Sequence, residues 1–207
     1  ANTTGTTNVA VGVSALQTNT TGDENTAVGH TALFTNNANE ATAVGYAAAY
    51  SNTTGVNLTA VGHSALKDNT SGNSNTAVGL YALTDNTTGA SNTAMGVAAM
   101  QLNTTGGTNV GIGQNALQNN TTSSNNAAVG YNALQSSTTG GYSTAMGYAT
   151  LENQTTGHNN HGFGWRSLDS VTTGNSICAL GSYTGTSITT GTAGTFVGHY
   201  AGFGVTG

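Results

Sequence analysis

The sequence predicts an all-β fold, a β-solenoid (a parallel β-roll or β-helix) of about twelve coils of 17 residues each. Three observations predict it: a strict internal repeat, two short apolar segments per repeat, and a polar turn between them. One glycine marks the repeat at intervals of 17 residues, with a single interval of 16; it stands at Gly12, Gly29, Gly45, Gly62, Gly79, Gly96, Gly113, Gly130, Gly147, Gly164, Gly181 and Gly198. A unit this small cannot bury a face alone, but stacked neighbours can.

Each unit reads Asn-Thr-Ala-Val-Gly-x-x-Ala-Leu-x-x-Asn-Thr-Thr-Gly-x-x, as in residues 75–91. The apolar segments are short for free-standing helices and typical of strands. Asn-Thr-Thr-Gly is a turn sequence, because Asn bonds its own backbone and Gly accepts a positive φ. We therefore expect two strands and two turns per coil, stacked at about 4.8 Å per coil into a rod roughly 55–60 Å long.

Two details of the repeat predict local structure. The 16-residue interval falls at Asn36-Asn37-Ala38-Asn39, so we expect the missing residue to shorten a turn. Stacked coils also place identical residues in ladders, and we expect the asparagines four before the repeat glycine to bond along their own column. They are Asn8, Asn25, Asn75, Asn92, Asn109, Asn126 and Asn160.

The apolar residue before each glycine forms a column that we assign as the structural core of the repeat: Val11, Val28, Val44, Val61, Val78, Met95, Ile112, Val129, Met146, Phe163, Leu180 and Val197. Alternation along a strand turns it away from the neighbouring Ala and Gly. If the column is outside it forms a large apolar patch, and if it is inside the opposite face is bare Ala and Gly, which packs closely on another backbone. Either assignment suggests strands covered on both sides, so we expect lateral association with copies of the chain. The alternative is a wide coil that buries Val with Leu and leaves Ala and Gly in water.

The repeat spans 1–207 as one domain, regular over 1–150 and degenerate over 151–207, where we expect an interface or a cap. Neither end shows a charged cap, and matching open sheet edges that repeat head to tail form filaments. The candidate assembly residues are Trp165, Tyr183, Phe196, His199, Tyr200 and Phe203.

Composition excludes several functions. Charged residues make up 4% of the chain, against about 25% in ordinary domains. With Lys67 and Arg166 as the fixed cations, we expect no nucleic-acid partner, and no apolar run is long enough for membrane insertion as a helix. The carboxylates are scattered over different coils, and His158 and His161 have no further ligand beside them. We expect no catalytic residue, no metal site, no cofactor and no enzymatic activity.

Two further columns are candidate contact sites. Aromatic residues after the repeat glycine, such as Tyr46 and Trp165, either stack on sugars or partners or form a packing stripe. Asn-x-Thr/Ser sequences recur in the turn, so a row of glycans is one interpretation and the turn itself is the other. The candidate glycosylation residues are Asn19, Asn52, Asn69, Asn86, Asn103 and Asn120.

The motif Asn-Thr-Ala-Val-Gly-x-x-Ala-Leu resembles the repeat of bacteriophage tail-fibre proteins and, more loosely, the heads of trimeric autotransporter adhesins, over nearly the whole chain. Those adhesin heads are parallel β-rolls that trimerise, with a shorter repeat. The resemblance implies an extracellular or virion-surface fibre that associates with itself and attaches to surfaces.

We therefore expect a structural, self-assembling subunit of an extracellular fibre or filament that polymerises through uncapped solenoid ends. Its partners would be copies of itself, end to end or laterally, and surface glycans; its location would be secreted, on a cell surface or on a virion. One alternative is a tail-fibre or adhesin segment that binds a cell surface. The other is an ice-binding solenoid, suggested by turn threonines such as Thr53 and Thr54.

Overall fold

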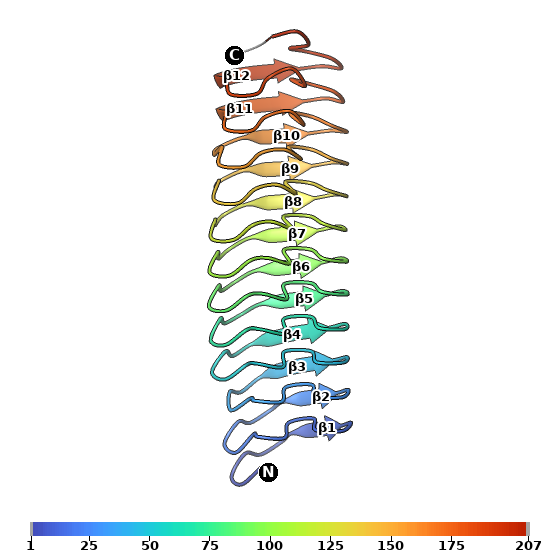
Figure 1. Ribbon diagram of the computed structural model, residues 1–207, viewed down its shortest axis with the longest axis vertical. Helices are drawn as coiled ribbons and strands as arrows, with labels where there is room; N and C mark the ends of the chain where they lie inside the picture. The colour runs from blue at the N-terminus through green and yellow to red at the C-terminus, as the bar shows by residue number, and fades with distance from the viewer. Residues whose placement is uncertain (1, 206–207) are drawn as a thin grey trace.

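The computed structural model describes residues 2–205, which form an all-β solenoid without helices (Figure 1). Twelve strands make one parallel sheet in chain order. They are β1 Val9–Val11, β2 Thr26–Val28, β3 Ala41–Val44, β4 Leu58–Val61, β5 Thr76–Val78, β6 Thr93–Met95, β7 Val110–Ile112, β8 Ala127–Val129, β9 Thr144–Met146, β10 His161–Phe163, β11 Asn175–Leu180 and β12 Thr192–Val197. Within this part of the chain no helix could cross a membrane.

The register confirms the 17-residue period. Ala60 of β4 pairs with Ala77 of β5, seventeen residues on, and all other neighbouring strands except β2 and β3 repeat this offset. Across β2 and β3 the offset is 16, where Ala27 pairs with Ala43, so the missing residue shortens the connection and leaves the strands in register. Each coil therefore stacks the same column positions on one another.

Each coil contains one strand, so the prediction of two is wrong. The Ala-Leu segment is a turn in which the residues two and four after the glycine are left-handed, as at Ser64 (φ 55°) and Leu66 (φ 54°). Its backbone still bonds to the next coil, with the Leu66 amide donating to the Ala82 carbonyl at 2.9 Å. Hydrogen bonding between coils offsets the cost of these conformations, which is about 1–2 kcal/mol per residue.

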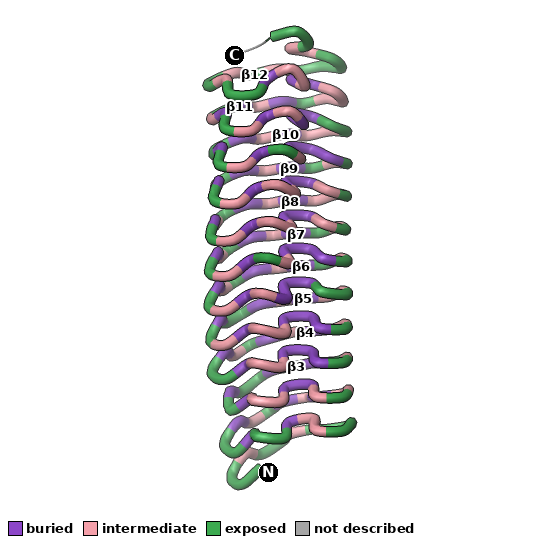
Figure 2. Tube along the Cα trace, in the orientation of Figure 1, coloured by how far each residue is buried: buried purple, intermediate pink, exposed green. Residues whose placement is uncertain are grey.

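The core is made of alanine and leucine, and the assignment of the Val column as core is wrong. The sheet contributes its central alanines, such as Ala60 and Ala77, and the turn contributes leucines such as Leu66 and Leu83, all of them fully buried. Residues of the Val column lie on the outside of the sheet (Figure 2). A coil with one three-residue strand is too narrow for Val and Leu together, so the wide-coil alternative is also wrong.

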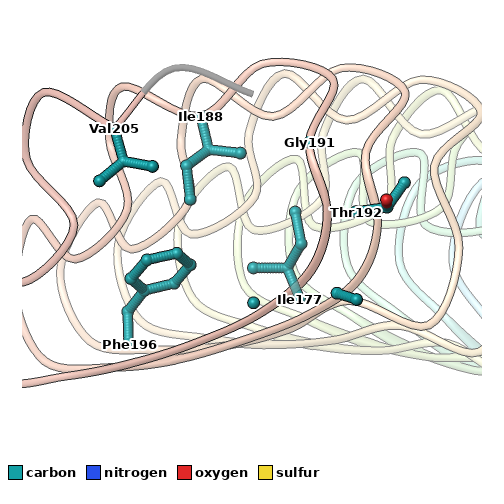
Figure 3. A pocket seen from close by; sticks show the side chains of 8 residues that line it. Ile177, Ile188, Gly191, Thr192, Phe196 and Val205 are labelled. Atoms are coloured by element: carbon teal, nitrogen blue, oxygen red, sulfur yellow. The ribbon is translucent and has the colours of Figure 1, made fainter.

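The last coils have a different interior. Val171 and Ile188 replace the buried turn asparagine, and Ile177 replaces the strand-side asparagine. Phe196 takes a position held by alanine in β11, and it points inward toward Ile188 and Val205 (Figure 3). Ile177, Ile188, Phe196 and Val205 are among the residues that line a hollow of about 220 Å³ at this end of the core.

Candidate functional site

One surface of the solenoid is regular and carries a continuous apolar column along its middle, and we call it the outer sheet face. It consists of three columns: the residue three before each repeat glycine, the residue one before it and the residue one after it. The first is mostly Thr, the second is the Val column and the third is rich in aromatic residues. Register pairing aligns the first two columns along the rod, as in Thr59↔Thr76 and Val61↔Val78, and ring stacking aligns parts of the third.

The Val column lies on the outer side along the whole sheet, where seven of its twelve residues are exposed and the other five, such as Val61 and Val78, are partly exposed. Val11 is 57% exposed, Met146 45% and Leu180 52%. Parallel sheets are normally covered on both faces, but only the inner face of this sheet meets a core. A contiguous apolar strip of this length is typical of an interaction surface.

Thr and Val alternate on four consecutive strands of this face, and Thr and Met on the next. Thr26 and Val28 lie on β2, and the same pattern holds on β3, β4 and β5, with Met95 in place of Val on β6. Sequence reasoning looked for ice-binding threonines in the turns and missed this set. The signal was the Thr-x-Val spacing of two, which places both side chains on one face of a strand.

The aromatic column stacks on itself. The Tyr46 ring lies between those of His30 and His63, with centroid distances of 5.4 and 4.8 Å and interplanar angles of 8° and 20°. Tyr131 and Tyr148 stack in the same way at 5.1 Å. Because each ring face is covered by the next ring, the stacked rings present edges to solvent, which favours the packing stripe over sugar stacking.

Five of the six candidate assembly residues lie together near the end of the sheet. Trp165 contacts Tyr183 at a centroid distance of 5.0 Å, and Tyr183 stacks on Tyr200 at 5.1 Å. Tyr200 also contacts His199 and Phe203. Phe196 is separate from this cluster because it points into the interior.

The candidate glycosylation residues are buried, so the folded solenoid leaves no space for glycans on them. Asn19, Asn52, Asn69, Asn86, Asn103 and Asn120 are all 0% exposed. They form a side-chain ladder inside the turn: the Asn69 amide donates to Asn52 Oδ1 at 2.9 Å and to the Gly72 carbonyl at 3.1 Å. The Asn-x-Thr pattern is therefore explained by the turn sequence itself and not by a row of glycans.

The other asparagine column does not bond along itself as expected. The Asn75 amide group donates to the Gly89 carbonyl of the next coil at 2.7 Å, and Asn75 Oδ1 accepts from the Asn92 backbone N–H at 2.9 Å. These bonds join the side chain of one coil to the backbone of the next. The side-chain ladder lies in the turn column instead.

The 16-residue coil breaks the turn ladder. Asn36 donates to the Ala38 carbonyl at 2.8 Å, and the buried Asn19 Oδ1 below it has no hydrogen-bond partner. Inserting Thr between Asn37 and Ala38, with Ala38→Gly, restores the standard turn sequence. We expect the free energy of unfolding to rise by about 1–3 kcal/mol in urea denaturation, because a buried acceptor gains its donor. The same insertion between Thr87 and Thr88 should destabilise; equal effects at both sites would contradict this explanation.

Two carboxylates, Asp68 and Asp85, occupy the same column on successive coils. Burial raises the pKa of Asp85, the Asp68 charge raises it further, and Lys67, which lies 3.3 Å from Asp68, lowers it. The folded protein therefore binds this proton more tightly than the unfolded chain, so stability falls as pH rises through the folded pKa from the ordinary value of 3.8.

Asp85→Asn should therefore stabilise the protein at pH 7, by less than about 1 kcal/mol because the carboxyl is largely solvated. The gain should disappear at pH 3, where Asp85 is protonated in both states. Urea denaturation at the two pH values measures it, with the exposed Glu24→Gln as control. A gain that persists at pH 3 would show that charge is not the cause.

No group of three metal-ligating side chains occurs among residues 2–205, and His158 and His161 gain no third ligand there. Comparison of the chain with protein-family models, with curated proteins and with solved structures gives no match.

Proposed function

We propose that this protein is a structural, self-assembling rod of an extracellular fibre, whose copies associate laterally through the outer sheet face. The observation that carries the proposal is the exposed Val column, which runs in register along all twelve strands. Covering it would give the parallel sheet the second layer that such sheets normally have.

End-to-end stacking is the other mode of self-assembly, and the outer sheet face does not bear on it. Lateral association is the mode that the Val column supports.

Two sequence features support a location outside the cell. Trypsin has two cleavage sites in the chain, Lys67 and Arg166, which suits a protein exposed to proteases. The repeat resembles bacteriophage tail-fibre proteins, so a tail-fibre or adhesin segment that attaches to a cell surface or its glycans is a narrower form of the same proposal.

Light scattering and negative-stain electron microscopy test the assembly. We expect oligomers or laterally bundled rods from the wild type, and monomers from Val78→Asp with Val129→Asp, because two charges would be desolvated in the interface. Thr88→Asp, on an exposed turn away from this face, should assemble normally. A monomeric wild type at high concentration would refute lateral assembly.

Ice binding is the second candidate, and the Thr-x-Val array of β2 to β5 favours it. Its methyl and hydroxyl groups repeat at the strand spacing of about 4.8 Å on a single face. A monomeric wild type that shows thermal hysteresis, lost in Thr59→Lys, would replace the fibre proposal. An assembled protein without hysteresis would exclude this candidate.

A further inference from the structure

We infer that the partner on the outer sheet face is one second copy of this chain, antiparallel and related by a two-fold axis along the strands. This inference rests on the proposed lateral assembly and specifies its geometry. In this arrangement each column faces its own copy in reverse order, so that β1 lies opposite β12 and β6 opposite β7.

Side-chain size carries the argument. In the Val column all five residues from β1 to β5 are valine, whereas bulkier residues, including Met146, Phe163 and Leu180, occur from β6 to β11. The antiparallel arrangement faces Val11 with Val197, Val28 with Leu180, Val44 with Phe163, Val61 with Met146, Val78 with Val129 and Met95 with Ile112.

Each large residue then meets a small one, except at the centre where Met95 meets Ile112. Close packing between two flat faces requires a nearly constant separation, and the antiparallel pairs vary less in combined size along the rod than Phe on Phe and Val on Val would. A parallel arrangement would instead place Phe163 on Phe163 at one end and valine on valine at the other. The two rods would diverge, and part of the interface would stay open.

The charge distribution favours the same orientation. Residues 1–103 hold five carboxylates and Lys67, a net charge of -4, whereas residues 104–207 hold two carboxylates and Arg166, a net charge of -1. Parallel rods would align the two acidic halves, and antiparallel rods separate them.

The area of the face is sufficient for a stable dimer. Twelve strands at about 4.8 Å and a width of four residue spacings of about 3.3 Å give roughly 750 Å² per copy. Specific protein interfaces bury about 800 Å² per partner. A two-fold interface uses this face completely, so assembly through this face should stop at the dimer.

The native Cys178 provides a test, because it occupies the Thr column of β11 and lies opposite β2 of an antiparallel partner. We expect Thr26→Cys to be joined to Cys178 of a second copy by a short bismaleimide. Most chains should be converted to a covalent dimer, and mass spectrometry should identify the link between residues 26 and 178. The wild type and the double variant Thr26→Cys with Cys178→Ser should stay uncross-linked.

Thr76→Cys, in the same column but about 14 Å from either predicted partner thiol, is the matched control and should give no covalent dimer. Links between identical residues, 178 to 178 or 26 to 26, would overturn the antiparallel orientation. A trimer or larger oligomer, measured by light scattering, would also overturn the antiparallel dimer. In both cases lateral assembly itself would stand, whereas a monomeric protein would refute the proposed function as well.

Discussion

Replacing Gly113 by alanine is expected to lower the free energy of unfolding by about 4 kcal/mol, a large effect for one methyl group. The added Cβ would lie 2.5 Å from the carbonyl oxygen of Gly130 and 2.7 Å from its carbonyl carbon. Both are backbone atoms of the next coil, so relief would require the coils to separate. The φ of 127° adds strain for any residue with a Cβ.

Gly198→Ala separates these two causes. Gly198 has a similar φ of 119°, but a Cβ there would meet no atom within 4 Å. We expect a loss of about 1–3 kcal/mol from backbone strain alone. Urea denaturation of both variants gives the difference, which measures the clash between coils. Equal losses would show that φ, and not backbone contact, requires glycine in the repeat.

The sequence was sufficient to predict stacking but not the structure of the Ala-Leu segment. A strict period of 17 forces equivalent residues into columns, whatever the conformation of the coil. The left-handed residues in this segment include Leu66, Met100 and Tyr81, which are not residues that signal positive φ. Hydrogen bonds and packing between coils impose this conformation. These interactions cannot be predicted from the sequence of a single repeat.

The two sides of the sheet could not be assigned from alternation alone. A strand such as Thr76–Val78 places Ala77 on one side and Val78 on the other, but the pattern is equally consistent with either side being inside. The narrow coil decides, because in the regular coils only a residue as small as alanine or glycine fits between the sheet and the turn leucines. The apolar column therefore lies on the outside of the sheet, where it is part of the candidate assembly face, and does not form the core.

The asparagine columns show a similar limit. Asn69 and Asn75 are both buried in the same coil, but the former bonds to its own column and the latter to backbone. Both are asparagines next to Thr or Ser in sequence, so the difference appears only when neighbouring coils are present. For the same reason, the sequence alone could not distinguish the buried asparagine ladder from a row of glycosylation sites.

Asn86→Ala is expected to destabilise the protein by about 4 kcal/mol, because it breaks the ladder at its centre. The Asn86 amide donates to Asn69 Oδ1 at 2.7 Å and to the Gly89 carbonyl at 2.9 Å, and its Oδ1 accepts from Asn103 at 2.7 Å. The substitution leaves buried polar groups on both neighbours without their partner. Each such group costs about 1–3 kcal/mol.

Asn119→Ala, a partly exposed asparagine beside the ladder, is the matched control and should change stability by less than about 0.5 kcal/mol. Asn86→Asp adds a test of the bonding direction, because a carboxylate cannot donate to Asn69 and Gly89. Burial and these two acceptors should raise the pKa of the introduced carboxyl, so the variant should gain stability as pH falls from 7 to 4. If Asn86→Asp is as stable as the wild type at pH 7, the amide ladder does not stabilise the coil stack, and the alanine and leucine core alone holds it.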